Sequence, residues 1–367
     1  MSAALPLPHR LARYRAWLRR ELTDGPLVGI LWEPDIPPLP DVVTSLGAGT
    51  SLQPEQIIPQ HFLPYVEQCY RQAAELPGDL IQAFTPAFGM PWVEAIAGCP
   101  VAVEPGSLWA QPALPSYTDR APLRFDPANP WLHKLTEFTR ALVAFSAERF
   151  PIALPQMRGP LDILAALRTP QQMSIDLIEQ PDQVGKLLVE LTALWIGVAG
   201  AVLAEIPPFH GGYCSRMRMW APGLAITPQN DISTLLSPRM YRRLVLPLDE
   251  QIVAAFPFHC FHMHGSESHQ VDNLLALERL TAIQFTLEHT LGGPSLEQTL
   301  PVLRRILAHK PLIVAALDVA SAERCLTELP AAGLCLTVAV SGAEIPAKFV
   351  AWVSEHQGRC MAARDIP

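Results

Sequence analysis

The sequence lacks the glycine motifs of the common nucleotide-binding folds. No GxGxxG follows an early apolar run and GxxxxGK[ST] does not occur, which removes the main support for a dinucleotide-binding or P-loop fold. Paired cysteines are missing too, because the seven cysteines include no CxxC pair. An odd, unpatterned set of thiols in a chain of 367 residues predicts reduced cysteines and a cytoplasmic location.

Charged residues are scarce, at 17% of the chain, and the formal net charge is -8. We expect no nucleic-acid partner, because phosphate binding requires clustered Lys and Arg. Charges also interrupt any signal-peptide layout near the N-terminus. The most apolar stretch, residues 187–206, carries two glutamates and is predicted to be a buried helix rather than a membrane span. One basic cluster is predicted to be a solvated helix face: Arg10, Arg13, Arg15, Arg19 and Arg20.

Apolar residues and proline are abundant, at 49% and 38 residues respectively. Such a chain can bury a large core. Many of the prolines lie before residue 160, with a dense group at 34–40, which predicts long loops laid over a scaffold.

Short apolar runs alternate with helix-like runs, most regularly from residue 257 to residue 357. This alternation predicts βαβ units with parallel strands. We therefore expect an α/β fold, a single (β/α)8 TIM-type barrel spanning 1–367. Residues 1–150 would form N-terminal helices, loops and the first strands, and residues 151–367 would form regular βα repeats. Strands are expected at 27–32, 80–84, 152–157, 257–263, 281–287, 312–317 and 334–340, with weaker candidates at 217–220 and 225–229.

Active sites of such barrels lie at the carboxyl ends of the strands. In this sequence the following residues occupy those positions: Trp32, Glu33, Arg158, Asp162, Asn230, Asp231, His262, His264, Glu288, His289, Asp318 and Ser341.

The densest group is His259-Cys260-Phe261-His262-Met263-His264. Residues two apart on a strand share one face, so His262 and His264 point the same way. Two imidazoles at a strand end can bind Zn²⁺, can act as acid and base, or can be hydrogen-bonded core residues. All three interpretations remain open at this point.

Carboxylates flank this pair in sequence. Glu288 ends the next strand and would complete a metal set of His262, His264 and Glu288, unless it is an exposed loop residue. Asp231 precedes a predicted helix and is either a site carboxylate or a turn cap. Such a set contains no thiolate.

Other strand-end side chains are candidates for substrate binding. Arg158 suits an anionic group, although it could instead pair with Asp162. The full set of predicted substrate-binding residues is Arg158, Asp162, Trp32, Trp220, Tyr213 and His289.

Three segments resemble the uroporphyrinogen decarboxylase superfamily, which includes corrinoid:coenzyme M methyltransferases. They are Gly159-Pro160-Leu161-Asp162, the run from Asp231-Ile232-Ser233 to Ser237-Pro238, and His262-Met263-His264-Gly265. The resemblance implies a (β/α)8 barrel enzyme. The chain departs from the family in two ways: it lacks the N-terminal Arg-x-Ala-Gly-Arg segment, and no cysteine lies in residues 342–346.

The resemblance implies an enzyme that acts on a small polar or anionic substrate, by methyl transfer or by lyase (decarboxylase) chemistry. His262, His264, Asp231 and Glu288 would be the catalytic residues. Zinc and a corrinoid protein as methyl donor or acceptor are the expected cofactor and partner, and a homodimer is compatible with the sequence. The alternative is a degenerate, non-catalytic barrel that binds a ligand or a partner protein.

Overall fold

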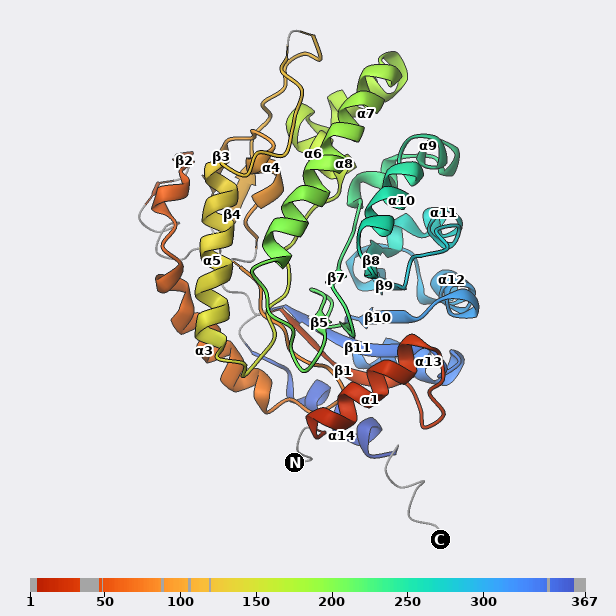
Figure 1. The fold of residues 1–367 in the computed structure, drawn as a ribbon. Coiled ribbons are helices and arrows are strands. Elements are labelled where there is room, and N and C mark those ends of the chain that lie inside the picture. The colour runs from red at the N-terminus through yellow and green to blue at the C-terminus, as the bar shows by residue number, and fades with distance from the viewer. Residues whose placement is uncertain are drawn as a thin grey trace.

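A curled sheet of six parallel strands organises the protein (Figure 1). The computed structural model describes residues 5–33, 46–47, 49–86, 89–104, 107–118, 120–341 and 344–359. In the described part of the chain the strand order is β1 (Leu27–Glu33), β11 (Leu334–Ser341), β10 (Leu312–Ala316), β9 (Ala282–Thr286), β8 (Phe258–His264) and β7 (Ala225–Ile226). The predicted parallel α/β arrangement is thus confirmed for these strands.

Two of the predicted strands do not form ladders. Segments 80–84 and 152–157 meet in one isolated parallel bridge, Phe84 with Ile152. Proline explains this, because it has no N–H to donate to a ladder, and Pro86, Pro151 and Pro155 lie in or beside these segments. Residues 217–220 lie mostly in the tip of a hairpin whose antiparallel strands are β5 (Tyr213–Cys214) and β6 (Trp220–Ala221).

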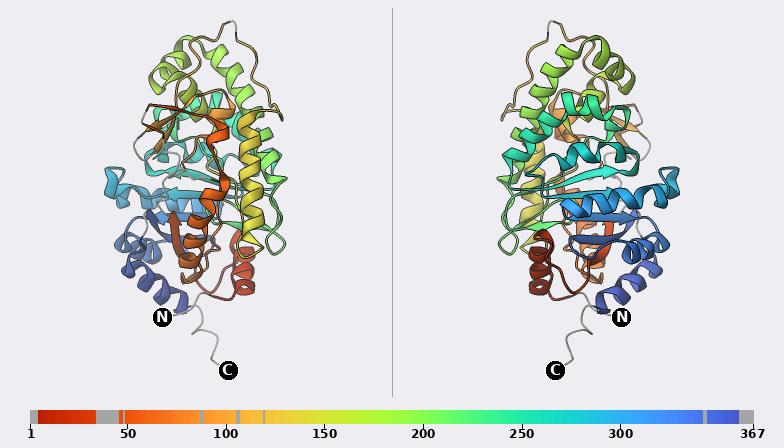
Figure 2. Two further views of the ribbon diagram at one scale, coloured as in Figure 1. Left: turned by 90° about the vertical axis from the view of Figure 1, so that its left-hand side faces the viewer. Right: turned by 90° about the vertical axis from the view of Figure 1, so that its right-hand side faces the viewer.

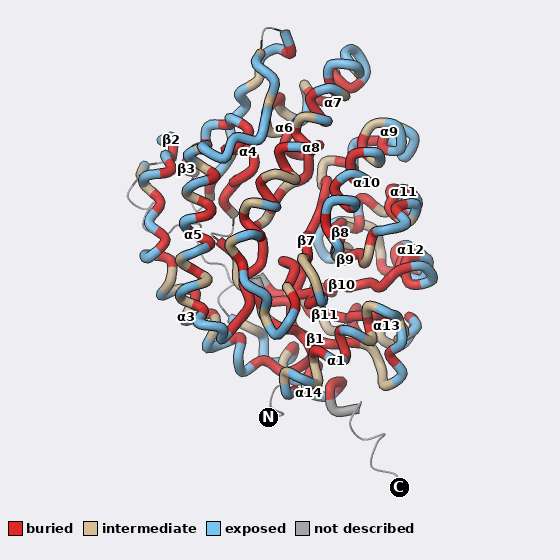
Figure 3. The backbone as a smooth tube through the Cα atoms, in the orientation of Figure 1, coloured by how far each residue is buried: buried red, intermediate tan, exposed pale blue. Residues whose placement is uncertain are grey.

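Helices cover the outer face of the sheet (Figures 1 and 2). Their outer sides are exposed and their inner sides are buried (Figure 3). Following β7 to β11 along the chain, they are α9 (Pro238–Leu244), α10 (Leu246–Ala255), α11 (Val271–Leu275), α12 (Leu296–His309), α13 (Val319–Glu328) and α14 (Ala347–Arg359). Short 3-10 turns join strands to helices at η2 (Asp231–Leu235), η3 (Gly265–Gln270) and η4 (His289–Leu291).

The first half of the chain is more structured than the predicted loops. A second, antiparallel sheet contains β2 (Ser51–Leu52), β3 (Val101–Glu104) and β4 (Ser107–Ala110). The helices of this half are α1 (Leu7–Leu18), α3 (Pro59–Ala74), α4 (Trp92–Ile96), α5 (Pro130–Ser146), α6 (Pro160–Arg168), α7 (Pro170–Glu179) and α8 (Pro181–Leu203), with the turn η1 (Pro54–Gln56). The proline group at 34–40 lies outside the described residues.

Helix α8 is the long apolar helix predicted near 187–206. By length and composition it could cross a membrane, but 56% of its most apolar window is buried inside the structure. It packs against α6, α5 and α10. These contacts agree with the predicted buried helix.

The two faces of the curled sheet belong to two different apolar clusters. Val28, Ile30, Phe261 and Phe285 pack with the outer helices. Residues of the opposite parity form an inner cluster with Tyr14 and Trp17 of α1: Leu27, Leu31, Cys260, Ala282, Ile313, Ala315 and Cys335. Most of these inner residues are small or medium-sized, and α1 packs against them with its two aromatic side chains.

The prediction of a solvated basic face on α1 is wrong for Arg13, and Arg10 is half-buried and donates to Leu80 O at 2.9 Å. Arg13 is only 5% exposed, and its guanidinium lies 2.7 Å from Asp79 Oδ1 and 2.6 Å from Asp24 Oδ2. The other carboxylate oxygen of Asp79 accepts a hydrogen bond from Val28 N. Arg19, by contrast, is exposed. Asp79 is 66 residues away in sequence, so no local pattern indicated the pairing.

We expect Arg13→Ala to lower the free energy of unfolding by about 3–5 kcal/mol, because it leaves Asp79 buried and uncompensated. Arg19→Ala, at the C-cap of the same helix, is the matched control and should cost at most about 1 kcal/mol. Chemical denaturation of both variants checks this prediction. Equal losses for the two variants would contradict a structural role for the buried pair.

Candidate functional site

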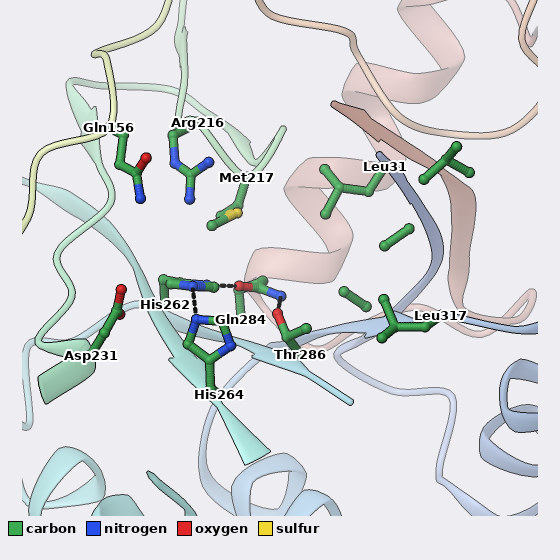
Figure 4. A pocket seen from close by; sticks show the side chains of 13 residues that line it. Leu31, Gln156, Arg216, Met217, Asp231, His262, His264, Gln284, Thr286 and Leu317 are labelled. Carbon is green, nitrogen blue, oxygen red and sulfur yellow. Dashed lines mark hydrogen bonds between the residues drawn. The ribbon is translucent and has the colours of Figure 1, made fainter. Parts of the chain in front are cut away.

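A cavity of about 290 Å³ lies at the carboxyl ends of β8 and β9. Figure 4 shows that its lining has two halves. One half is polar and consists of Gln156, Arg216, Asp231, His262, His264, Gln284 and Thr286. The other half is largely apolar and consists of Leu31, Met217, Ala315, Leu317, Ala339 and Val340. We call this space the histidine cavity.

His262 and His264 meet at the polar end of the cavity, as their strand parity predicts. Their Nε2 atoms are 3.1 Å apart, and the rings lie nearly edge to face (Figure 4). His262 is buried, whereas 31% of the His264 side chain is exposed. The pair therefore has one imidazole in the wall and one at the opening.

The other nitrogen of each ring faces an acceptor. His262 Nδ1 contacts Gln284 Oε1, and Gln284 Nε2 donates to Thr286 Oγ1 at 3.0 Å. His264 Nδ1 lies 2.9 Å from Glu288 Oε1. The Gln284 contact favours a proton on His262 Nδ1, whereas His264 Nδ1 lies close to Glu288 without the geometry of a hydrogen bond. The two Nε2 atoms can then share one hydrogen bond donated by His264, or both can turn a lone pair toward a metal ion.

Asp231 is the carboxylate that lies beside the two histidines. Ligand atoms of Asp231, His262 and His264 all lie within 4.8 Å of one another. Asp231 Oδ2 accepts from Gln229 Nε2 at 2.8 Å, while its Oδ1 is buried and accepts no hydrogen bond from the described residues. Burial raises the pKa of Asp231, and His264 and Arg216 oppose that rise.

The donor set fits a zinc ion. Two nitrogens bound tetrahedrally at about 2.05 Å would lie about 3.3 Å apart, close to the 3.1 Å separating the two Nε2 atoms. Asp231 is placed to offer a third ligand, because its Oδ1 has no partner among the described residues and the ligand atoms of the three residues lie within 4.8 Å of one another. The predicted metal set of His262, His264 and Glu288 therefore needs a correction. Glu288 lies on the far nitrogen of His264, and Asp231 takes its place.

Asp162 was predicted to bind substrate. In the structure its carboxylate accepts hydrogen bonds that hold the backbone at Asp231 in place. The Asp162 carboxylate accepts backbone N–H groups of Gly159, Asp231 and Ile232, at 3.3, 3.1 and 2.8 Å respectively. Burial and the neighbouring Asp231 raise the pKa of Asp162 to about 7. Asn230 reinforces the same junction, since its side chain accepts from Leu161 N.

Glu267 holds the backbone of His264 and was not anticipated. Its carboxylate accepts from His264 N at 2.7 Å and from Ser233 Oγ at 2.8 Å. Burial raises its pKa to about 9. Its position three residues after His264 matches a capping box, so a local signal was present.

Arg216 and Gln156 also line the cavity without having been predicted. Arg216 sits in the tip of the β5–β6 hairpin, and it is 6% exposed. Arg218 fixes this tip by donating to Trp32 O at 2.9 Å, and Tyr14 Oη donates to Arg218 O at 2.6 Å. The sequence carries no local signal for this arrangement.

The remaining predicted residues lie away from the cavity lining. Trp32 packs in the outer cluster. Trp220 is buried beneath Arg15, and Tyr213 pairs with Ala221 in the hairpin. His289 Nε2 contacts Ser321 and Asp318 instead. Arg158 lies 3.6 Å from Glu94 rather than against Asp162. The side chains of Glu33 and Ser341, and residues 342–343, are outside the described residues.

The inner-face thiol nearest the pair is Cys260, two residues before His262 on the same strand. It is fully buried, and burial raises its pKa. It therefore stays a thiol at neutral pH, in line with a site that lacks a thiolate.

Comparison with known proteins places the fold. A solved methyltransferase from Methanosarcina mazei has a similar fold, with a TM-score of 0.64 at 13% identity, and the match covers 95% of this chain and 98% of that chain. No family model and no curated protein matches the sequence. At this identity the likeness concerns the fold, and it extends over nearly the whole chain.

We expect Gly159→Ala to destabilise the protein by about 1–3 kcal/mol through overpacking. A Cβ at this position would lie 1.8 Å from Gln229 O and 2.4 Å from Asn230 Oδ1. Gly185→Ala in α8 is the control, because a Cβ there meets nothing within 4 Å, and alanine should stabilise this helix by up to about 1 kcal/mol. Thermal denaturation that ranks Gly159→Ala at or above wild type would contradict the close approach.

Proposed function

We propose that this chain is a divergent member of the uroporphyrinogen decarboxylase superfamily that transfers a methyl group to or from a small anionic substrate. The observation that carries the proposal is the meeting of two Nε2 atoms and an unpartnered Asp231 oxygen in one cavity. The fold likeness to a methyltransferase supports methyl transfer rather than another barrel chemistry. Segments 80–84 and 152–157 would complete one (β/α)8 barrel domain beside β1 and β7.

His262, His264 and Asp231 would hold zinc or a similar ion. Such an ion would supply Lewis acidity, which favours the anionic form of a bound nucleophile or polarises a carbonyl. The protein's own part is to orient the ligands: Gln284 and Glu288 fix the two rings through their Nδ1 atoms, and Asp162 fixes Asp231. Such supporting contacts commonly change metal affinity by about 10–100-fold.

The remaining residues of the cavity indicate which class of substrate the proposal requires. Arg216 offers a guanidinium that suits a carboxylate or sulfonate, and Gln156 offers an amide beside it (Figure 4). The apolar half, with Leu31 and Leu317, would contact a short hydrocarbon portion. A molecule of this kind fits a cavity of about 290 Å³. A corrinoid protein as methyl donor or acceptor belongs to the same proposal.

Acid–base lyase chemistry is the second candidate. Without a metal ion, one Nε2–H would donate to the other Nε2, so the two rings would share one proton in a hydrogen bond. Asp231 lies beside this pair. Such a pair could give and take a proton at a substrate carbon or oxygen.

We predict that the protein binds one zinc ion and that the His262→Ala, His264→Ala and Asp231→Asn variants lose it. Each variant removes one of the atoms that meet in the cavity. Glu288→Gln should weaken zinc binding by roughly 10–100-fold without abolishing it, because it supports His264 from behind. Zinc content after dialysis, together with competition by a chelator, measures both effects.

Cys260→Ser is the matched control for the zinc experiment and should keep full zinc. Loss of zinc in Cys260→Ser alone would overturn the thiolate-free site. A wild-type protein that binds no zinc would favour the shared-proton pair and lyase chemistry.

The methyl-transfer test uses zinc-loaded protein with methylcobalamin and a panel of small carboxylates and sulfonates bearing a thiol, amine or hydroxyl. In each turnover the Co–C bond breaks with its electron pair left on cobalt, the acceptor–carbon bond forms, and the acceptor's proton passes to solvent. We expect Arg216→Gln to raise KM for the acceptor at least tenfold with a smaller change in kcat, because Arg216 binds the anion in both states.

Arg216→Lys, which keeps the charge, should recover part of that loss. The appearance of cob(I)alamin in the visible spectrum measures the rate. If no acceptor in the panel demethylates the cofactor, methyl transfer from a corrinoid is contradicted. If Arg216→Gln leaves KM unchanged, the anion does not bind at Arg216.

A further inference from the structure

A second pocket, which we call the Glu94 pocket, lies beside the histidine cavity. It is formed between α4, β4 and the segment after Ile152, and its volume is about 120 Å³. Gln156 lines both this pocket and the histidine cavity. Trp109 and Arg158 line it together with a groove of about 350 Å³ on its other side. The Glu94 pocket therefore lies between the histidine cavity and this groove, and it shares a wall residue with each of them.

The Glu94 pocket contains a carboxylate with an unused acceptor. Glu94 is 1% exposed, and its Oε1 is buried and accepts no hydrogen bond from any described residue. The nearest cationic atom is Arg158 Nε, at 3.6 Å, which is beyond hydrogen-bond distance. A buried carboxylate oxygen without a donor is unfavourable. The arrangement is therefore suited to a ligand that brings an N–H group.

Arg158 restricts which N–H group can bind. Its guanidinium donates hydrogen bonds and carries a positive charge, so it opposes a cationic ligand beside Glu94. A carboxylate ligand is opposed by Glu94 itself. Glu94 as an acceptor beside Arg158 as a donor instead matches a neutral ligand that has adjacent N–H and C=O groups. A lactam has such an edge.

Trp109 supplies a surface for a flat ring. Its indole, on β4, is 51% exposed, although it is one of the largest apolar side chains. It borders the Glu94 pocket and the groove together with Arg158. Aromatic side chains in such positions stack on planar heterocycles.

We infer that the Glu94 pocket binds a flat heterocyclic lactam. Its N–H donates to Glu94 Oε1, its C=O accepts from Arg158, and its ring packs on Trp109. Through Gln156 the bound ring adjoins the histidine cavity, where it could be one partner of a two-substrate reaction. Only that last role rests on the proposed function, whereas the binding itself does not.

The test measures binding of 2-quinolone, a flat lactam, to the full-length protein by calorimetry and ligand-observed NMR. N-methyl-2-quinolone is the matched probe, because it keeps the ring and the carbonyl but has no N–H. We expect 2-quinolone to bind saturably and N-methyl-2-quinolone to bind at least tenfold more weakly. Equal binding of the two probes, or no binding of either, would overturn the inference.

Variants locate the site. Glu94→Gln should weaken 2-quinolone at least fivefold, because the amide replaces one carboxyl oxygen by an NH2 group that cannot accept the lactam N–H. Trp109→Ala should do the same and lies at the surface, so it tests the pocket even if Glu94→Gln fails to fold. Glu179→Gln, an exposed glutamate on α7, is the control and should bind as wild type does. If Trp109→Ala also binds as wild type does, the ring does not occupy this pocket.

His262→Ala separates the two proposals. It removes a proposed zinc ligand but no residue of the Glu94 pocket, so 2-quinolone binding should be unchanged. Unchanged binding together with a wild-type protein that transfers no methyl group would contradict the proposed function alone. Loss of binding in His262→Ala would contradict a separate pocket.

Discussion

Buried carboxylates stabilise the backbone where the strands of the sheet meet irregular segments of the chain. Each accepts backbone N–H groups: Asp79 from Val28, Asp162 from Gly159, Asp231 and Ile232, and Glu267 from His264. Buried N–H groups need acceptors, and these carboxylates supply them. Two of them set the positions of Asp231 and His264.

Burying these carboxylates is electrostatically unfavourable, and this affects the charge around the histidine cavity. Burial raises the pKa of Asp162 to about 7 and that of Glu267 to about 9, and each carries hydrogen bonds to residues that line the histidine cavity. The positively charged and neutral hydrogen-bond donors of the cavity are therefore surrounded by carboxyl groups whose pKa is raised. The anionic substrate proposed for Arg216 would meet less repulsion there than a set of fully ionised carboxylates would impose.

The two pockets differ in the side chains that they offer to a ligand. The histidine cavity combines the imidazole pair and Arg216 with an apolar wall, whereas the Glu94 pocket combines a lone acceptor with a donor and an exposed indole. Gln156 belongs to both. The separation allows two different molecules to lie close together without competing for the same side chains.

Local pattern was enough to predict much of the fold. The strand–helix alternation after residue 257 predicted β8 to β11 and their helices, because periodicity in a strand or helix depends on near neighbours. The same reasoning predicted the antiparallel hairpin tip near 217–220 as a strand, since a short apolar run does not reveal its partner. The three-stranded antiparallel sheet was missed for that reason, because its short strands are defined only by their pairing, β3 with β4 across a turn and β2 with β3 from a distant part of the chain.

The sequence by itself determined that His262 and His264 share a face, since strand parity is local. Only the tertiary structure decided which carboxylate lies beside the two histidines. Glu288 is nearer in strand order, yet it lies at His264 Nδ1, and Asp231 reaches the Nε2 side from the preceding strand. The surroundings of Arg13, Arg216 and Glu94 were also decided by the tertiary structure. Each contact depends on where segments far apart in the chain come to lie, and residue type and spacing do not encode that.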